Sequence, residues 1–159
     1  MGFLYSAFIR KNTPELRAKL EDLGYTNGAW ETPRFHYPYL SVWPNPKFGL
    51  FKGEGFYMTE DDYRFNGKVW EYKPKKDVID CGDNEELFLA IAALRNDTDK
   101  NQWFICQEEY ISTYTMDFVK VGTWQLNTQH DKLTYGLKHL WRKASVEELI
   151  KYFGCYGSR

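Results

Sequence analysis

The most regular hydrophobic pattern lies near the middle of the chain and predicts a strand, a helix and a second strand. The β-prone run 78–81 comes first, and Asp83 or Asn84 then offers a side-chain oxygen that caps the first turn of a helix. Apolar residues follow at the helical spacing i, i+3, i+4 and i+7, namely Leu87, Ala90, Ile91 and Leu94. Residues 102–106 have the composition of a strand. We expect this helix to form the centre of the hydrophobic core.

Two more amphipathic helices are predicted, one near each end of the chain. The first is capped by Asn12 or Thr13 and has Pro14 at its first position, where the missing N–H breaks no hydrogen bond. The last is capped by Ser145, with a glutamate three residues later at the capping-box spacing, and Gly154 is predicted to end it. The residues expected on the buried faces are Leu16, Leu20 and Leu23 in the first helix and Val146, Leu149, Ile150 and Phe153 in the last.

Short runs rich in β-branched and aromatic residues predict strands before, between and after these helices. The predicted strands span residues 3–9, 39–43, 48–51, 56–58, 68–72, 110–116, 118–126 and 137–142. The acidic segment 59–67 is predicted to be a turn region, and Gly122 is expected to interrupt the strand that contains it. This order of elements indicates an α+β fold, a twisted antiparallel sheet with about three helices packed on one side. With 159 residues, we expect a single domain spanning 1–159.

The net charge and the number of cysteines limit the classes of function that the protein can have. A net charge of −1 argues against a duplex-DNA binder, which would show a basic stripe, and equally against an acidic DNA mimic. Three widely spaced cysteines, an odd number, indicate reduced thiols in a cytoplasmic protein. No apolar run approaches the ~20 residues of a membrane span, and the N-terminal segment does not have the pattern of a signal peptide. We therefore expect a cytoplasmic protein without membrane or duplex nucleic-acid partners.

The aromatic content is high, with six Trp, twelve Tyr and eleven Phe. One interpretation is a compact, strand-rich core, because aromatic side chains fit pleated surfaces and fill cores. The other is a binding face, because Tyr and Trp are enriched at interfaces. On the second interpretation, four residues of the predicted strands and their flanks are candidates for stacking on a small nucleotide-class ligand: Tyr37, Tyr39, Trp43 and Trp70.

Motifs for catalysis and metal binding match only in part. Four residues occupy positions 1, 3, 5 and 12 of a calcium-loop template, namely Asp97, Asp99, Asn101 and Glu108. Position 6 should be glycine and is Gln102, so an ordinary loop is favoured. No histidine stands at metal-ligand spacing from another histidine or cysteine, and no glycine-rich phosphate-binding motif occurs. Cys81 precedes a helix N-terminus, where a thiolate is stabilised, but its apolar neighbours predict burial. We predict no cofactor, no metal and no enzymatic activity.

The central stretch also carries a resemblance. Its pattern at 81–88 and 90–94, followed by Asp99 and by Gln-Trp-Phe at 102–104, resembles a motif in small uncharacterised proteins encoded by phages, prophages and mobile elements of Bacteroidota. Residues 13–16 and 145–153 are similar to the same group, and the likeness covers about a third of the chain. It implies an accessory protein working in the cytoplasm of a bacterial host and assigns no site residues.

Two functions follow as hypotheses. The first is a non-enzymatic interaction module that binds a host protein, in the manner of an inhibitor of a host defence factor. The alternative is a protein that binds or sequesters a small nucleotide-class ligand. A homo-oligomer is compatible with both. The first is favoured by the near-neutral charge, the aromatic excess and the lack of a complete catalytic motif.

Overall fold

The computed structural model describes residues 3–25, 39–43, 55–56, 63–65, 70–72, 78–113, 115–129 and 139–157. Within them the helices are α1 (Pro14–Leu23), α2 (Glu85–Ala92) and α3 (Val146–Gly157). The strands are β1 (Ser6–Ile9), β2 (Leu40–Trp43), β3 (Gly55–Phe56), β4 (Tyr63–Phe65), β5 (Trp70–Tyr72), β6 (Val78–Asp80), β7 (Gln102–Cys106), β8 (Tyr110–Ile111), β9 (Phe118–Val119), β10 (Trp124–Asn127) and β11 (Trp141–Lys143). Three helices with mostly antiparallel sheets confirm the α+β class.

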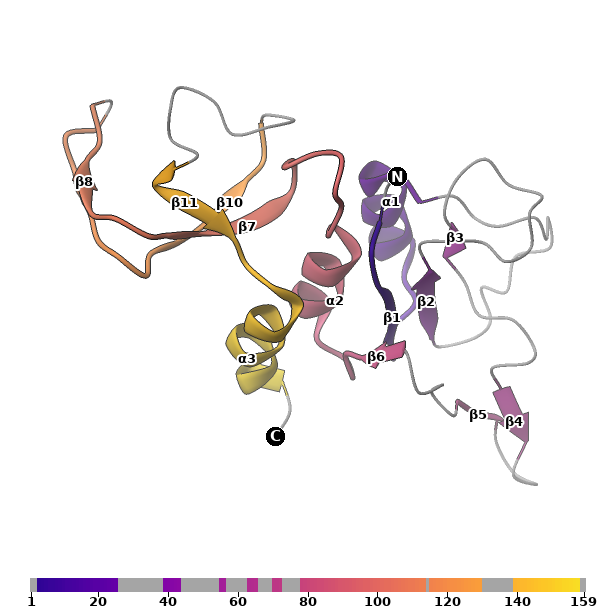
Figure 1. The fold of residues 1–159 in the computed structure, drawn as a ribbon. Coiled ribbons are helices and arrows are strands. Elements are labelled where there is room, and N and C mark those ends of the chain that lie inside the picture. Colours follow the sequence, from indigo (N-terminus) through magenta and orange to yellow (C-terminus); the bar gives the residue numbers. More distant parts are fainter. Residues whose placement is uncertain are drawn as a thin grey trace.

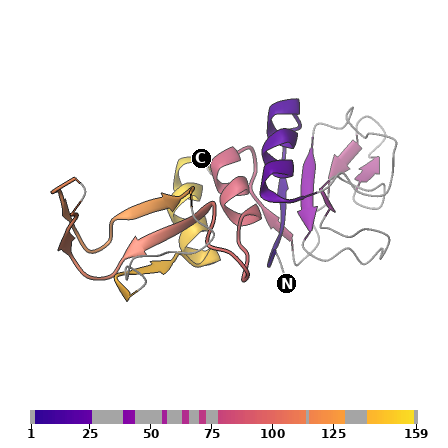
Figure 2. The ribbon, with the colours of Figure 1, turned by 90° about the horizontal axis from the view of Figure 1, so that it is seen from above.

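The strands form several sheets, two of which lie at opposite ends of a helical centre. One has the order β3-β2-β1-β6, in which β1 pairs antiparallel with β2 and parallel with β6. The other has the order β10-β7-β11 and is antiparallel throughout. Figure 1 and Figure 2 place α2 in the middle, with α3 and the β10-β7-β11 sheet on one side and α1 with β1 on the other. The helices therefore separate two sheets.

The predicted central helix is confirmed. Asn84 is its N-cap, and the Oδ1 atom of Asn84 accepts a hydrogen bond of 3.1 Å from the Leu87 N–H. The Nδ2 atom of Asn84 also donates to the Phe153 carbonyl at 2.7 Å, so the same residue ties α2 to α3. Almost every apolar side chain of the segment is buried, namely Leu87, Phe88, Ala90, Ile91, Ala92, Ala93 and Leu94. Burial extends round the helix because it has neighbours on both sides.

The first helix begins and ends as predicted. The Oγ1 atom of Thr13 accepts from the Leu16 N–H at 3.1 Å, which selects Thr13 over Asn12 as the cap. Gly24 adopts φ 110° at the C-terminal end, a conformation that favours glycine. Tyr25, which follows it, is buried, stacks on Phe3 with ring centroids 3.9 Å apart, and donates from its hydroxyl to the Ala92 carbonyl at 2.7 Å. Tyr25 therefore joins the end of α1 to the end of α2.

The capping box of the last helix is confirmed. The Ser145 N–H donates to Oε1 of Glu148 at 2.9 Å, and the Glu148 N–H donates to Oγ of Ser145 at 3.1 Å. Arg142 donates to both carboxylate oxygens of Glu148 at 2.7 Å. The bond from Arg142, followed by that from the Ser145 backbone, lowers the pKa of Glu148 to about 2. Glu148 therefore stabilises the fold fully above its ordinary pKa of 4.5, and this contribution is lost as the pH falls through about 2.

Two details of the last helix differ from the prediction. Gly154 does not end it, since α3 continues to Gly157. Ile150 was expected on the buried face and is exposed, whereas Leu149 and Phe153 are buried. The packed face of α3 is centred on these two residues, because α2 and the aromatic rings of β7 and β10 cover that side and leave Ile150 on the open one.

Within the described residues, most strands lie where they are predicted, but they are shorter than the predicted ranges. The run 110–116 contributes only β8, and the run 118–126 is divided into β9 and β10 around Gly122 at φ 90°, as expected. The turn predicted at 59–67 is wrong at 63–65, which form β4 and pair with β5. The predicted strand 48–51 lies outside the described residues.

Candidate interaction surface

Of the four aromatic residues predicted to bind a ligand, only Tyr39 has a side chain within the described part of the chain. Tyr37 lies outside the described residues, and for Trp43 in β2 and Trp70 in β5 only the backbone is described. Tyr39 is half-buried, and its ring centroid lies 5.4 Å from that of Phe8. Because Phe8 is fully buried, Tyr39 packs against the core on the side of this contact.

The clearest exposed feature is a hairpin that we call the arm, residues 107–123 with strands β8 and β9. Figure 1 and Figure 2 show it extending from the β10-β7-β11 sheet, away from α2. A small second core holds its base and comprises Phe104, Cys106 and Trp141, with Tyr110, Val119 and Leu140 packed around them. The Trp141 Nε1–H donates to the Tyr110 hydroxyl at 3.1 Å, and the two rings meet edge to face. The arm is therefore anchored rather than loosely attached.

The two faces of the arm are both apolar. In the strand pairing, Tyr110 is opposite Val119 and Ile111 is opposite Phe118. Since successive side chains point to opposite faces of a strand, Tyr110 and Val119 face the small core together, and Ile111 and Phe118 face outward together. The outward pair is exposed to 60% and 54%. The solvent-exposed face of an antiparallel strand pair is normally polar. An exposed apolar pair at this place is therefore typical of a surface that binds another molecule.

Two further apolar residues of the arm are exposed. Met116 is 74% exposed at the turn of the arm, and Val121 is 59% exposed near its base. We call the exposed cross-strand pair Ile111 and Phe118 the outer face of the arm. The sequence predicts strands here but not this surface.

The turn of the arm also has an unfavourable backbone conformation. Met116 has φ 61°, and its N–H donates to the Ser112 carbonyl at 2.8 Å. The left-handed region costs a residue with a side chain roughly 1–2 kcal/mol. The other non-glycine residue at positive φ among those described is Asn101, a type that tolerates this conformation. Backbone strain and apolar exposure thus coincide at Met116, as they do at many binding sites.

Exposed charged residues are a further feature of the arm. The arm carries Glu108, Glu109 and Asp117 against a single Lys120, and all four are exposed. None of these side chains forms an ion pair with another described residue. The exposed charges of the arm, next in sequence to its exposed apolar residues, are therefore mostly acidic.

Met116→Asn is expected to raise the free energy of unfolding by about 0.5–1 kcal/mol, because asparagine tolerates the left-handed conformation better than methionine. Urea denaturation of both proteins measures the difference. The matched control is Thr115→Asn, at an exposed neighbour without positive φ, for which a change within about 0.5 kcal/mol is expected. An equal gain from both substitutions would show that the turn at Met116 is not strained.

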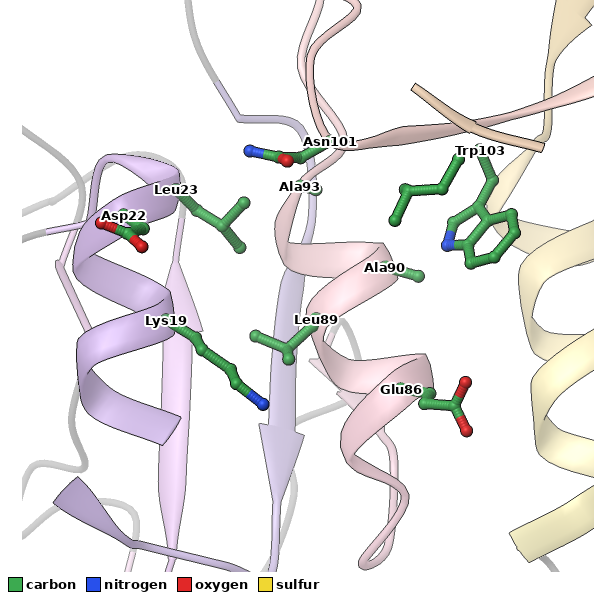
Figure 3. Close-up of a pocket in the computed structure, with 10 residues that line it drawn as sticks. Lys19, Asp22, Leu23, Glu86, Leu89, Ala90, Ala93, Asn101 and Trp103 are labelled. Carbon is green, nitrogen blue, oxygen red and sulfur yellow. The ribbon is translucent and has the colours of Figure 1, made fainter. Parts of the chain in front are cut away.

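A second candidate site is a groove of about 340 Å³ that lies across α2. Leu89, Ala90 and Ala93 of α2 line its floor, with Trp103 of β7 beyond them. In Figure 3, Leu23 and Lys19 approach α2 from α1 on one side, and Trp103 closes the other. The rest of the lining is Asp22, Glu86, Asn101 and Leu126. The groove joins a neighbouring hollow over the loop 95–101, which shares part of this lining.

The cysteine and calcium-loop motifs have structural roles. Cys81 is buried, and burial raises the pKa of its thiol to about 12, so it is protonated at neutral pH. Asp97 accepts two hydrogen bonds from Arg95, at 2.8 and 2.9 Å. Asp99 pairs with the Lys143 ammonium at 3.1 Å, and this ammonium also donates to the carbonyls of Arg95 and Thr98. The carboxylates of Asp97 and Asp99 are therefore held by Arg95 and Lys143 of the chain itself.

Among the described residues, no three His, Cys, Asp or Glu side chains come together in a way that would hold a metal ion. Within the same residues, no helix has the length and apolar character needed to cross a membrane. Comparisons with models of protein families, with curated proteins and with solved structures gave no match. The function of the protein is therefore inferred from the geometry of the arm and the groove.

Proposed function

We propose that this protein is a non-enzymatic interaction module that binds a host protein through the outer face of the arm. The observation that carries the proposal is the cross-strand pair Ile111 and Phe118, which is more than half exposed on a hairpin anchored by its own small core. Large apolar side chains gathered on an exposed surface are typical of protein-binding sites, where one or two anchors contribute most of the binding energy.

The acidic residues of the arm indicate the chemistry of the partner. Glu108, Glu109 and Asp117 would repel the phosphates of nucleic acid and the anionic surface of a cytoplasmic membrane. They favour a protein that presents an apolar cleft bordered by lysine or arginine, since complementary charges speed association and select the partner.

The proposed setting comes from the resemblance of residues 81–104 to proteins of phages and mobile elements. We assign the protein to the cytoplasm of the bacterial host as an accessory protein that inhibits a host defence factor. Inhibition requires only a bound complex, which an arm with an apolar face is suited to form. A second candidate function, binding of a small ligand, is favoured by the groove across α2.

Photo-crosslinking in host cells tests the proposal. A benzophenone-bearing amino acid replaces Phe118 on the arm, and in a control protein it replaces Lys151, an exposed residue of α3. We expect one discrete crosslinked host protein from position 118, reduced by an excess of unlabelled wild-type protein, and not from position 151. The same set of weak products from both positions would contradict an interface on the arm.

A further inference from the structure

We propose that the groove across α2 binds a small organic ammonium ion with an apolar body. Its volume of about 340 Å³ lies within the range of small-ligand sites. The floor is formed by Leu89, Ala90 and Ala93, which would receive the apolar body of the ligand. This site is separate from the arm, so the proposal does not rest on the interaction with a host protein; it specifies the ligand of the second candidate function.

The charges at the rim select a cation. Asp22 on α1 and Glu86 on α2 both line the groove, and both are exposed. Among the described residues neither carboxylate has an ion-pair partner. Figure 3 shows them on opposite sides of α2, with the apolar floor between them. An ammonium group over this floor is thus attracted from both sides.

The lysine that lines the groove does not cancel this preference. The Lys19 Nζ atom lies 3.0 Å from Oε1 of Glu85, and Lys11 contacts the other oxygen of Glu85 at 2.6 Å. These contacts, with that of Lys11 the larger, lower the pKa of Glu85. Lys19, Lys11 and the shared Glu85 together carry a charge of +1 against the −2 of Asp22 and Glu86, so the surroundings of the groove keep a net negative charge. Lys100 lies at the neighbouring hollow and does not line the groove.

The aromatic wall adds a second attraction for a cation. The face of an indole ring attracts ammonium groups through its quadrupole. The Trp103 ring is held by the rings of Phe153 and Trp124, with centroids 5.3 and 6.4 Å away, so it is positioned before any ligand binds. Figure 3 shows Trp103 and Glu86 on the same side of α2. A nucleotide, by contrast, would bring its phosphates against two carboxylates, so this groove favours a cation over that class of ligand.

The test uses 2-phenylethylammonium chloride as the probe and sodium 3-phenylpropionate as an anion of similar shape, each titrated into the full chain while Trp indole N–H signals are followed by NMR. We expect the cation to bind with a Kd on the order of 1 mM and the anion not to bind in the same range. Equal binding of the two probes would overturn the proposal, because it would show that the rim charges do not select the ligand.

Charge-neutralising variants locate the site. Glu86→Gln is expected to raise the Kd of the cation about threefold, and Asp22→Asn together with Glu86→Gln about tenfold. The matched control is Glu147→Gln, since Glu147 is also the exposed second residue of a helix but does not line the groove, and no change is expected. An unchanged Kd in the double variant would place binding elsewhere. Crosslinking from the arm is unaffected by either result, so the two proposals fail separately.

Discussion

Replacing Phe88 by alanine is expected to lower the free energy of unfolding by about 3–5 kcal/mol. Phe88 is fully buried in α2, the helix that contacts β1, α1 and α3. Removing the Phe88 ring leaves a cavity in the main hydrophobic core. The closely packed neighbouring side chains can fill this cavity only in part. A domain of this size is stable by about 5–15 kcal/mol, so the variant is expected to be partly or wholly unfolded near 37 °C.

Urea denaturation at 25 °C measures this effect, with Leu89→Ala as the control on the same helix. Leu89 is half-buried and faces the groove, so its truncation is expected to cost about 1–2 kcal/mol. Similar losses for the two variants would mean that α2 is a covering helix rather than the centre of the core.

Much of this centre could be predicted from sequence because its signals are local. Asn84 and Thr13 cap their helices through hydrogen bonds to residues three positions away. Ser145 and Glu148 do the same reciprocally. These capping contacts involve no distant part of the chain, so a short stretch of sequence is enough to predict where each helix begins. The apolar spacing of α2 is equally local, and from Leu87 to Ala92 every side chain of this helix is apolar and buried or half-buried.

The burial or exposure of several other residues could not be predicted, because it depends on which distant segment of the chain covers each of them. Tyr25 is buried because its hydroxyl reaches Ala92, 67 positions along the chain. Ile150 is exposed because its neighbours on α3, and not Ile150 itself, meet the rings of β7 and β10. The exposed face of the arm is defined in the same way, since Trp141 covers Tyr110 and thereby fixes Ile111 as outward. When both faces of a strand carry apolar residues, the sequence pattern does not indicate which face is buried.

The division into two cores separates stability from binding. The main cluster surrounds α2, whereas the base of the arm is held by Phe104, Cys106 and Trp141. The outer face belongs to neither cluster. Substitutions there remove little buried surface, so the fold keeps its stability when the proposed interface is altered. This makes the arm suitable for a test in which folding and binding are measured independently.

The double variant Ile111→Thr, Phe118→Thr is expected to weaken binding of the crosslinked host protein at least about a hundredfold, because anchors of this kind each contribute 2 kcal/mol or more. Threonine keeps the preference for strands, so the free energy of unfolding is expected to change by less than about 1 kcal/mol. Calorimetric titration of the purified partner measures the first quantity, and thermal unfolding the second. The control is Leu4→Thr, Ile150→Thr, which removes two exposed apolar side chains outside the arm and is expected to leave the affinity unchanged. If the arm variant keeps its affinity within about twofold while the control loses it, the interface includes Leu4 or Ile150, and the outer face of the arm has another role.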